Sequence, residues 1–177
     1  GCASHYSYGY GCYCRTGGAY YGPCGGAGWG AAYNPATGTY ARAGAAYGPN
    51  GAAWGAQAYN PMTNTYAQHT GGTNGYQSWG NSYVQQGDKW AAAGHQSGAY
   101  GSAGWAQNSS GQWAAGAKGN NGNAVATGSS GNVYASHDGN VYKNTDGSWQ
   151  KYDGSGNWSN ASANKPVQTP SGASSAN

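Results

Sequence analysis

The stretch YNPATGTYA at positions 33–41 returns as YNPMTNTYA at positions 59–67, 26 residues further along the chain. Asn-Pro starts a turn, because proline fixes φ at the second turn position. Gly38 can take a positive φ, and Asn64, which replaces it in the second copy, is the next best residue for that conformation. Each copy therefore predicts a β-hairpin closed by a cross-strand tyrosine pair, Tyr33 with Tyr40 and Tyr59 with Tyr66.

A second turn signal repeats with the same period. Tyr-Gly-Pro occurs at 21–23 and again at 47–49, so each 26-residue unit is expected to hold two strands and two turns. Trp29 and Trp54 lie between the two kinds of turn, one residue out of register with the repeat. These two tryptophans and the four paired tyrosines are the candidate residues for stacking between molecules.

The rest of the chain carries weaker or shorter repeats. Residues 71–108 contain degenerate copies, and from about residue 109 turn dipeptides such as Asn121-Gly122, Asp138-Gly139 and Asp146-Gly147 recur every eight or nine residues. Dipeptides of this kind are typical of tight hairpin turns. They predict a meander of short strands with a row of Val, Tyr and Trp on one side, followed by a flexible Ser/Ala/Asn/Pro tail over 161–177.

Composition limits what can form a core. The chain of 177 residues has 35 Gly, 17 Tyr and 8 Trp, and no Leu, Ile, Phe or Glu. Burial must therefore come from Tyr, Trp and Ala. We expect an all-β protein of repeated short antiparallel hairpins, sandwich- or solenoid-like or an open meander, with little or no helix. Its expected segments are an arm (1–28), hairpin repeats (29–70), degenerate repeats (71–108), the meander (109–160) and the tail.

All four cysteines lie in the N-terminal arm, at Cys2, Cys12, Cys14 and Cys24. An even number of cysteines in a short Gly-rich segment predicts disulfides and an oxidising compartment. Cys12 and Cys14 are too close to pair comfortably, which leaves Cys2–Cys12 with Cys14–Cys24, or Cys2–Cys14 with Cys12–Cys24. A four-thiolate zinc site is less consistent with this spacing.

Charge is sparse, with seven Lys+Arg, four Asp and a net charge of +3. Such a surface favours self-association, unless Asn, Gln, Ser, Thr or attached glycans keep the chain in solution. The scattered cations form no basic stripe for nucleic acid, and no apolar run is long enough to span a membrane.

We expect no catalytic, cofactor or metal site. Asp138, Asp146 and Asp153 stand in turn dipeptides or loops, where backbone geometry explains them. The histidines are isolated in the sequence, and the adjacent pair His137-Asp138 is not by itself a catalytic triad.

Exposed aromatic rows suggest a second kind of site, a platform on which sugar rings stack. The candidate contacts are Trp113, Tyr134, Tyr142, Trp149 and Trp158, although the composition favours the core as the place of such rings, because no other side chains could form one. Asn-x-Ser triplets mark Asn108, Asn157 and Asn160 as candidate glycosylation sites.

The motifs together resemble a group of uncharacterised bacterial secreted or envelope proteins. The matching segments are the two YNPxTGxYA copies, the Tyr-Gly-Pro turns, and 138–142 with 146–152, which read DGNVY and DGSWQKY. The resemblance implies an exported bacterial protein, extracellular or on the cell surface, and implies no reaction. The expected function is therefore a self-assembling structural subunit of an extracellular filament or coat, and the alternative is a glycan- or cell-wall-binding module.

Overall fold

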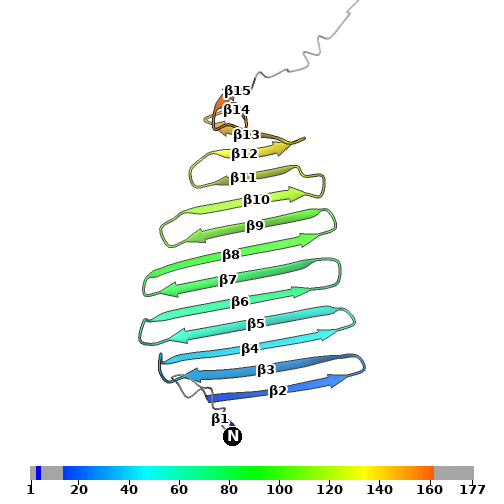
Figure 1. Ribbon diagram of the computed structural model, residues 1–177, viewed down its shortest axis with the longest axis vertical. Helices are drawn as coiled ribbons and strands as arrows, with labels where there is room; N and C mark the ends of the chain where they lie inside the picture. Colours follow the sequence, from blue (N-terminus) through cyan, green and yellow to red (C-terminus); the bar gives the residue numbers. More distant parts are fainter. Residues whose placement is uncertain (1–2, 5–13, 162–177) are drawn as a thin grey trace, which may run out of the picture.

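A computed structural model describes residues 3–4 and 14–161, and places all of their strands in one sheet (Figure 1). The fifteen strands follow one another across the sheet in chain order, from β1 to β15. Each strand is antiparallel to its neighbours, and the described residues contain no helix. The predicted all-β, helix-free meander is confirmed.

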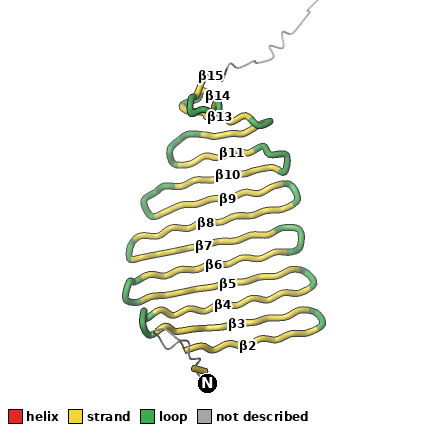
Figure 2. The backbone as a smooth tube through the Cα atoms, viewed as in Figure 1, coloured by secondary structure: helices red, strands yellow, loops and turns green. Residues whose placement is uncertain are grey.

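The sheet narrows along its length (Figure 2). Strands β2 to β8 have nine or ten residues each, and β15 has three. The bounds are β1 (Ala3–Ser4), β2 (Cys14–Gly22), β3 (Gly25–Asn34), β4 (Thr39–Gly48), β5 (Gly51–Asn60), β6 (Thr65–Thr73), β7 (Ser78–Gln86), β8 (Lys89–Gly98), β9 (Gly101–Asn108), β10 (Trp113–Gly119), β11 (Ala124–Gly128), β12 (Val133–His137), β13 (Asn140–Thr145), β14 (Ser148–Tyr152) and β15 (Trp158–Asn160).

The 26-residue unit folds into two strands and two turns, as predicted. Tyr33 is the direct partner of Tyr40, and Tyr59 is the direct partner of Tyr66. In the first turn the side-chain oxygen of Asn34 accepts the Ala36 N–H at 3.0 Å, and in the second that of Asn60 accepts the Met62 N–H at 2.9 Å. Gly38 (φ 69°) and Asn64 (φ 48°) both adopt the left-handed conformation that the turn requires.

The backbone of two C-terminal turns explains why Asp-Gly occurs in them. In the turns 138–139 and 146–147 both central residues have positive φ, 48° and 77° in one and 51° and 85° in the other. Positive φ at both positions is the signature of a type I′ turn, whose twist matches that of the flanking strands.

No side chain of the described residues is buried, and the sheet has no hydrophobic core. The buried residues are all glycines, and a ring from a neighbouring strand lies over each of them. The pairs are Gly26 under Tyr47, Gly71 under Trp54, Gly72 under Trp79, Gly80 under His95 and Gly94 under Trp105. Aromatic rings laid on cross-strand glycines stabilise the sheet where the glycine itself offers nothing to pack.

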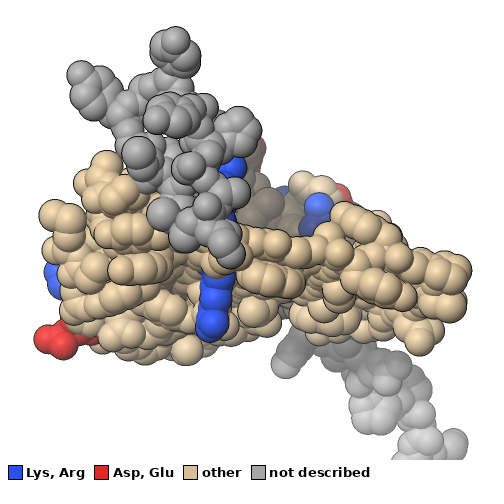
Figure 3. All heavy atoms as spheres, turned by 90° about the horizontal axis from the view of Figure 1, so that it is seen from below, with Lys and Arg blue, Asp and Glu red and all other residues tan. Residues whose placement is uncertain are grey.

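The sandwich- or solenoid-like arrangement is not found, because the described strands form a single layer. Seen along the direction in which the strands follow one another, the described residues form an elongated slab with few charged groups on its visible surface (Figure 3). From β2 to β15, turns of two to five residues bring each strand back beside the previous one, so none of these strands crosses to a second sheet.

The prediction of a disulfide-pinned arm is wrong for Cys24, which is free and exposed. Cys14 starts β2 and Cys24 lies in the turn just beyond its far end, at Gly22, so their Cα atoms stand ~26 Å apart at ~3.3 Å per residue. A disulfide needs Cα atoms within about 7 Å. The other two cysteines, Cys2 and Cys12, lie outside the described residues.

Candidate functional site

The two faces of the sheet are the candidate functional surfaces, and the strand register assigns each residue to one of them. Residues directly opposite each other in an antiparallel pair share a face, and neighbours along a strand alternate. The face that carries Tyr33, Tyr40, Tyr59 and Tyr66 is called the tyrosine face. The opposite face, which carries Ala41, Ala58 and Ala67, is called the alanine face.

On the tyrosine face, four tyrosines form an unbroken row across β3, β4, β5 and β6. Each is the direct cross-strand partner of the next, in the order Tyr33, Tyr40, Tyr59 and Tyr66. The aromatic series continues through Tyr83 to Trp90, with ring centroids 6.2 Å apart between Tyr66 and Tyr83, and 6.3 Å apart between Tyr83 and Trp90. The four tyrosines predicted for stacking therefore lie together.

The two predicted tryptophans are separated by the sheet. Trp29 lies on the tyrosine face opposite Gly18 and Gly44, whereas Trp54 lies on the alanine face over Gly71. Both remain accessible, with 59% and 41% of their surface exposed. Stacking between molecules would thus engage the two rings on opposite sides.

On the alanine face, small side chains line up in two adjacent rows across the strands. The first row runs Ala32, Ala41, Ala58, Ala67, Val84 and Ala91. The second includes Ala43, Ala56, Ala93, Ala106 and Ala114, interrupted by His69 and Ser82, whose side chains are hydrogen-bonded at 2.9 Å. Both rows line an open trough of about 1030 Å³ that runs from β2 to β10.

This trough was missed at the level of sequence, although a signal for it exists. Alanines recur at every second position of one strand, as at Ala41, Ala43 and Ala45, and again at Ala56 and Ala58. Alternation of this kind places the alanines on one face of a strand.

The five aromatics predicted to contact glycans do not share a face. Trp113, Tyr142 and Trp149 lie on the tyrosine face, and Tyr134 and Trp158 on the alanine face. The two rings on the alanine face form a cluster with Tyr152. The ring centroid of Trp158 lies 6.4 Å from that of Tyr134 and 5.2 Å from that of Tyr152.

Lys143 extends over the Trp158 ring at 5.2 Å, so this small cluster is packed on itself. The Val/Tyr/Trp row expected on one side of the meander is likewise divided, since Val125 and Val133 lie on the tyrosine face and Val141 on the alanine face.

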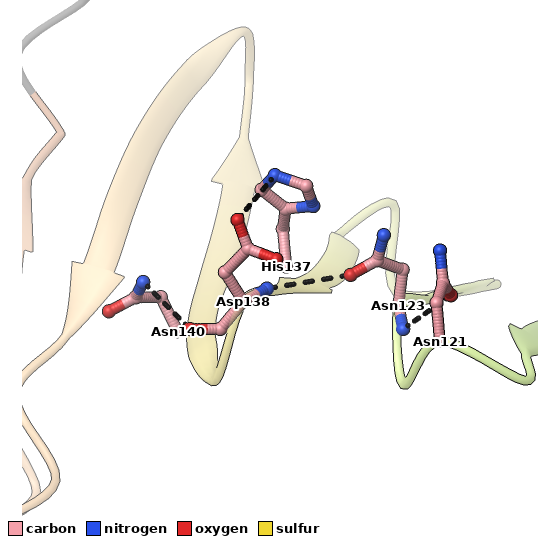
Figure 4. A network of polar contacts seen from close by, with 5 residues as sticks. All are labelled: Asn121, Asn123, His137, Asp138 and Asn140. Carbon is pink, nitrogen blue, oxygen red and sulfur yellow. Dashed lines mark hydrogen bonds and ion pairs between the residues drawn. The ribbon is translucent and has the colours of Figure 1, made fainter.

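A polar network joins two neighbouring turns at one edge of the sheet (Figure 4). The Nε2 atom of His137 lies 3.1 Å from the carboxylate of Asp138, and both side chains are mostly exposed. The Asp138 N–H donates to the side-chain oxygen of Asn123 at 3.4 Å, and Asn140 Nδ2 donates to the Asp138 carbonyl at 3.4 Å. These contacts tie the turn 138–139 to the loop before β11.

The candidate glycosylation sites differ in how their amide nitrogens are engaged. Asn108 Nδ2 donates to Gln112 Oε1 at 2.8 Å, and Asn157 Nδ2 donates to the Asp153 carboxylate at 3.0 Å. Asn160 is exposed in β15. Glycosylation at any of the three stays a prediction.

Comparisons with family models, with curated proteins and with solved structures gave no match. Within the described ranges, no three His, Cys, Asp or Glu side chains gather closely enough to hold a metal ion. In the same part of the chain there is no helix long and apolar enough to cross a membrane.

Proposed function

We propose that this chain is a structural subunit whose copies associate through the faces of their sheets to build a filament or coat outside the cell. One observation supports this most directly: among the described residues no second layer covers either face of the sheet, and large apolar side chains are exposed on each. A sheet with apolar faces is stable when another layer covers it. Large exposed apolar surfaces also mark sites of association.

The alanine face is the surface that we assign to the main contact, and its partner is a second copy of the same face. Small side chains let two sheets approach to about 10 Å, the spacing of stacked sheets. The strands β2 to β10 span roughly 40 Å across the sheet at ~4.8 Å per strand, and at ~3.3 Å per residue they are roughly 23–33 Å long. This part of the face therefore offers on the order of 1,000 Å² per copy, which exceeds the ~800 Å² per partner of a standard stable interface.

Charge is sparse on this contact and lies at its margins. Between β2 and β10 the alanine face carries Arg15 near one end, Lys89 at a strand end and Lys118 in β10, and these strands contain no acidic residue. The two alanine rows lie between these cations, so stacked copies would bring mostly methyl groups together.

An open strand edge supports growth in a second direction. Among the described residues, β1 pairs with only Cys14 and Arg15 of the nine-residue β2. The outer edge of β2 from Thr16 to Gly22 therefore presents backbone N–H and C=O groups without a described strand partner, as an edge does when it recruits another chain.

Ala56→Lys tests the assignment, because Ala56 is exposed in the middle of the second alanine row. We expect the wild-type chain to form multimers in sedimentation velocity and ordered filaments or sheets by electron microscopy. The variant places a charge in the contact and should shift the chain to monomer with an unchanged far-UV circular dichroism spectrum. Ala46→Lys, an exposed alanine of the tyrosine face, is the matched control and should assemble like the wild type.

Two results would contradict the proposal at different levels. A wild-type chain that stays monomeric at high concentration, with nothing ordered in micrographs, would eliminate assembly altogether. Assembly that survives Ala56→Lys and is lost in Ala46→Lys would move the contact to the tyrosine face.

A further inference from the structure

The tyrosine pair of the first hairpin has a geometry that its copy in the second hairpin lacks. The rings of Tyr33 and Tyr40 stack with centroids 4.5 Å apart and planes inclined by 30°. The two residues are direct partners on β3 and β4, so the backbone holds the rings together. Tyr33 is half-buried and Tyr40 is 55% exposed, which leaves the pair accessible to a reagent in solution.

The equivalent pair in the second hairpin has the same backbone register but a different arrangement of rings. Within the part of the chain that the structure describes, no ring contact joins Tyr59 to Tyr66. The Tyr66 hydroxyl donates to Gln68 Oε1 at 2.7 Å, and its ring lies against Tyr83, tilted by 54°.

One side chain explains the difference between the copies. The residue two positions after the second tyrosine is Gln68 in one hairpin and Arg42 in the other. A glutamine oxygen accepts a hydrogen bond from the phenol, whereas a guanidinium has no acceptor atom. Arg42 instead donates from Nε to Gln57 Oε1 at 2.7 Å, and the Tyr40 ring is left to stack on Tyr33.

We propose that Tyr33 and Tyr40 are the site of an oxidative cross-link, a carbon–carbon bond between the two rings. A one-electron oxidant of the peroxidase class removes one electron and the hydroxyl proton from each phenol. The unpaired electron of each phenoxyl radical is shared with the ring carbons beside the oxygen, and two such carbons form the new bond. The hydrogen on each bonded carbon then moves to its oxygen and restores the aromatic ring.

The overall step balances with one molecule of hydrogen peroxide. The two tyrosines together lose two hydrogen atoms, and the peroxide is reduced to two molecules of water. The stack makes this step local, because both radicals arise on neighbouring strands and meet without diffusion. The isolated Tyr76 and Tyr100, which are 86% and 94% exposed, have no such partner in the described chain.

The cross-link would supply a covalent constraint, which the free Cys24 does not provide. It closes a covalent loop around the turn 35–38 in a sheet that has no buried side chain to hold its hairpins. Covalent loops stabilise a fold chiefly by restricting the unfolded chain. The bond forms within one chain, so this inference does not rest on the proposed assembly.

The experiment treats the dilute full-length chain with horseradish peroxidase and hydrogen peroxide, then digests it with trypsin. Cleavage after Arg15 and Arg42 gives a peptide spanning 16–42, which contains Tyr33 and Tyr40. We expect this peptide to lose the mass of two hydrogen atoms, to show dityrosine fluorescence, and to give no backbone fragments between positions 33 and 40.

Three variants in the same peptide decide the matter. Tyr33→Phe and Tyr40→Phe keep a ring in place but remove one phenol, and each should abolish the cross-link. Tyr20→Phe is the matched control, since Tyr20 is 70% exposed on the same face and takes no part in the stack, and it should leave the yield unchanged. A wild-type peptide without the mass loss overturns the proposal, as does a cross-link that persists in Tyr40→Phe or one that joins Tyr20 or Tyr21 instead.

Discussion

At the scale of single residues, aromatic rings packed on glycines stabilise this sheet in place of the hydrophobic core that stabilises other proteins. Gly71 and Gly72 are neighbours in β6, and each is covered on a different face, by Trp54 from β5 and by Trp79 from β7. One strand is thus held between two indoles. Because glycine has no side chain, the ring can lie directly on the backbone and shield its hydrogen bonds from water.

Gly71→Ala should destabilise the sheet, because an added Cβ would lie 2.6 Å from the Trp54 indole. The ring must move away and lose its contact, at a cost of about 1–3 kcal/mol. Gly28→Ala is the control, since its added Cβ would meet nothing closer than 3.7 Å, and it should be neutral or stabilising by ~0.5–1 kcal/mol. Urea denaturation of both variants measures the difference.

The two partners should also be coupled. In a Trp54→Ala background the clash is absent, so Gly71→Ala should cost little there, with a coupling of ~0.5–3 kcal/mol. Additive effects in this cycle would show that the ring and the glycine do not act together.

At the scale of strands and turns, the sequence predicted the hairpins well and their faces poorly. A turn with an even number of residues pairs odd positions with even ones, as with Tyr33 and Tyr40 or Tyr134 and Lys143. Consider two residues that are an even number of positions apart. If two such turns lie between them, they are on the same face of the sheet, and if only one such turn lies between them, they are on opposite faces.

This parity explains which predictions held. The 26-residue period spans two even turns, so Tyr33 and Tyr59 share the tyrosine face. The eight-residue step from Tyr134 to Tyr142 spans only one even turn, so those rings lie on opposite faces. Trp29 and Trp54 are an odd number of positions apart across two turns, which separates them. Parity predicts that Tyr33 and Tyr40 are on the same face, but it cannot predict that their rings stack, because the stack depends on the hydrogen bond that the Arg42 side chain makes to Gln57.

Acid should loosen the last hairpin, because the Asp153 carboxylate holds the turn between β14 and β15. It accepts the Ser155 N–H at 2.7 Å and, through hydrogen bonds at 3.0 and 3.1 Å, two N–H groups of Asn157. These bonds, led by that of the Ser155 backbone, hold the pKa of Asp153 well below its ordinary 3.8. A lowered folded pKa stabilises the fold above the unfolded pKa, and this contribution is lost as pH falls below about 4.

The Trp158 resonances in an NMR titration report on this turn, since Trp158 packs on Tyr152 in β14. They should change towards unfolded values at acidic pH in the wild type. Asp153→Asn should remove this contribution to the acid dependence. An identical acid response in that variant would assign the change to another group.

At the scale of the whole molecule, the sheet behaves as a one-dimensional array. Within residues 3–4 and 14–161, only strands that are consecutive in the chain contact one another, so none of the described elements ties one end of the sheet to a distant strand. The stability of such an array is approximately a sum of strand terms and nearest-neighbour terms, and opening can start at either end. The narrowing from ten-residue strands to the three-residue β15 makes the C-terminal end the weaker one.

Hydrogen exchange on the dilute full-length chain should therefore show a gradient of protection rather than one global value. The slowest amides are expected in β6 and β7, which have paired strands on both sides and lie under Trp54, Trp79 and His95. Protection should fall towards β2, and fall further towards β14 and β15, because the short strands lose fewer hydrogen bonds when they open. Uniform protection across all strands would mean that the sheet unfolds as one cooperative unit, which a single layer with nearest-neighbour contacts alone does not provide.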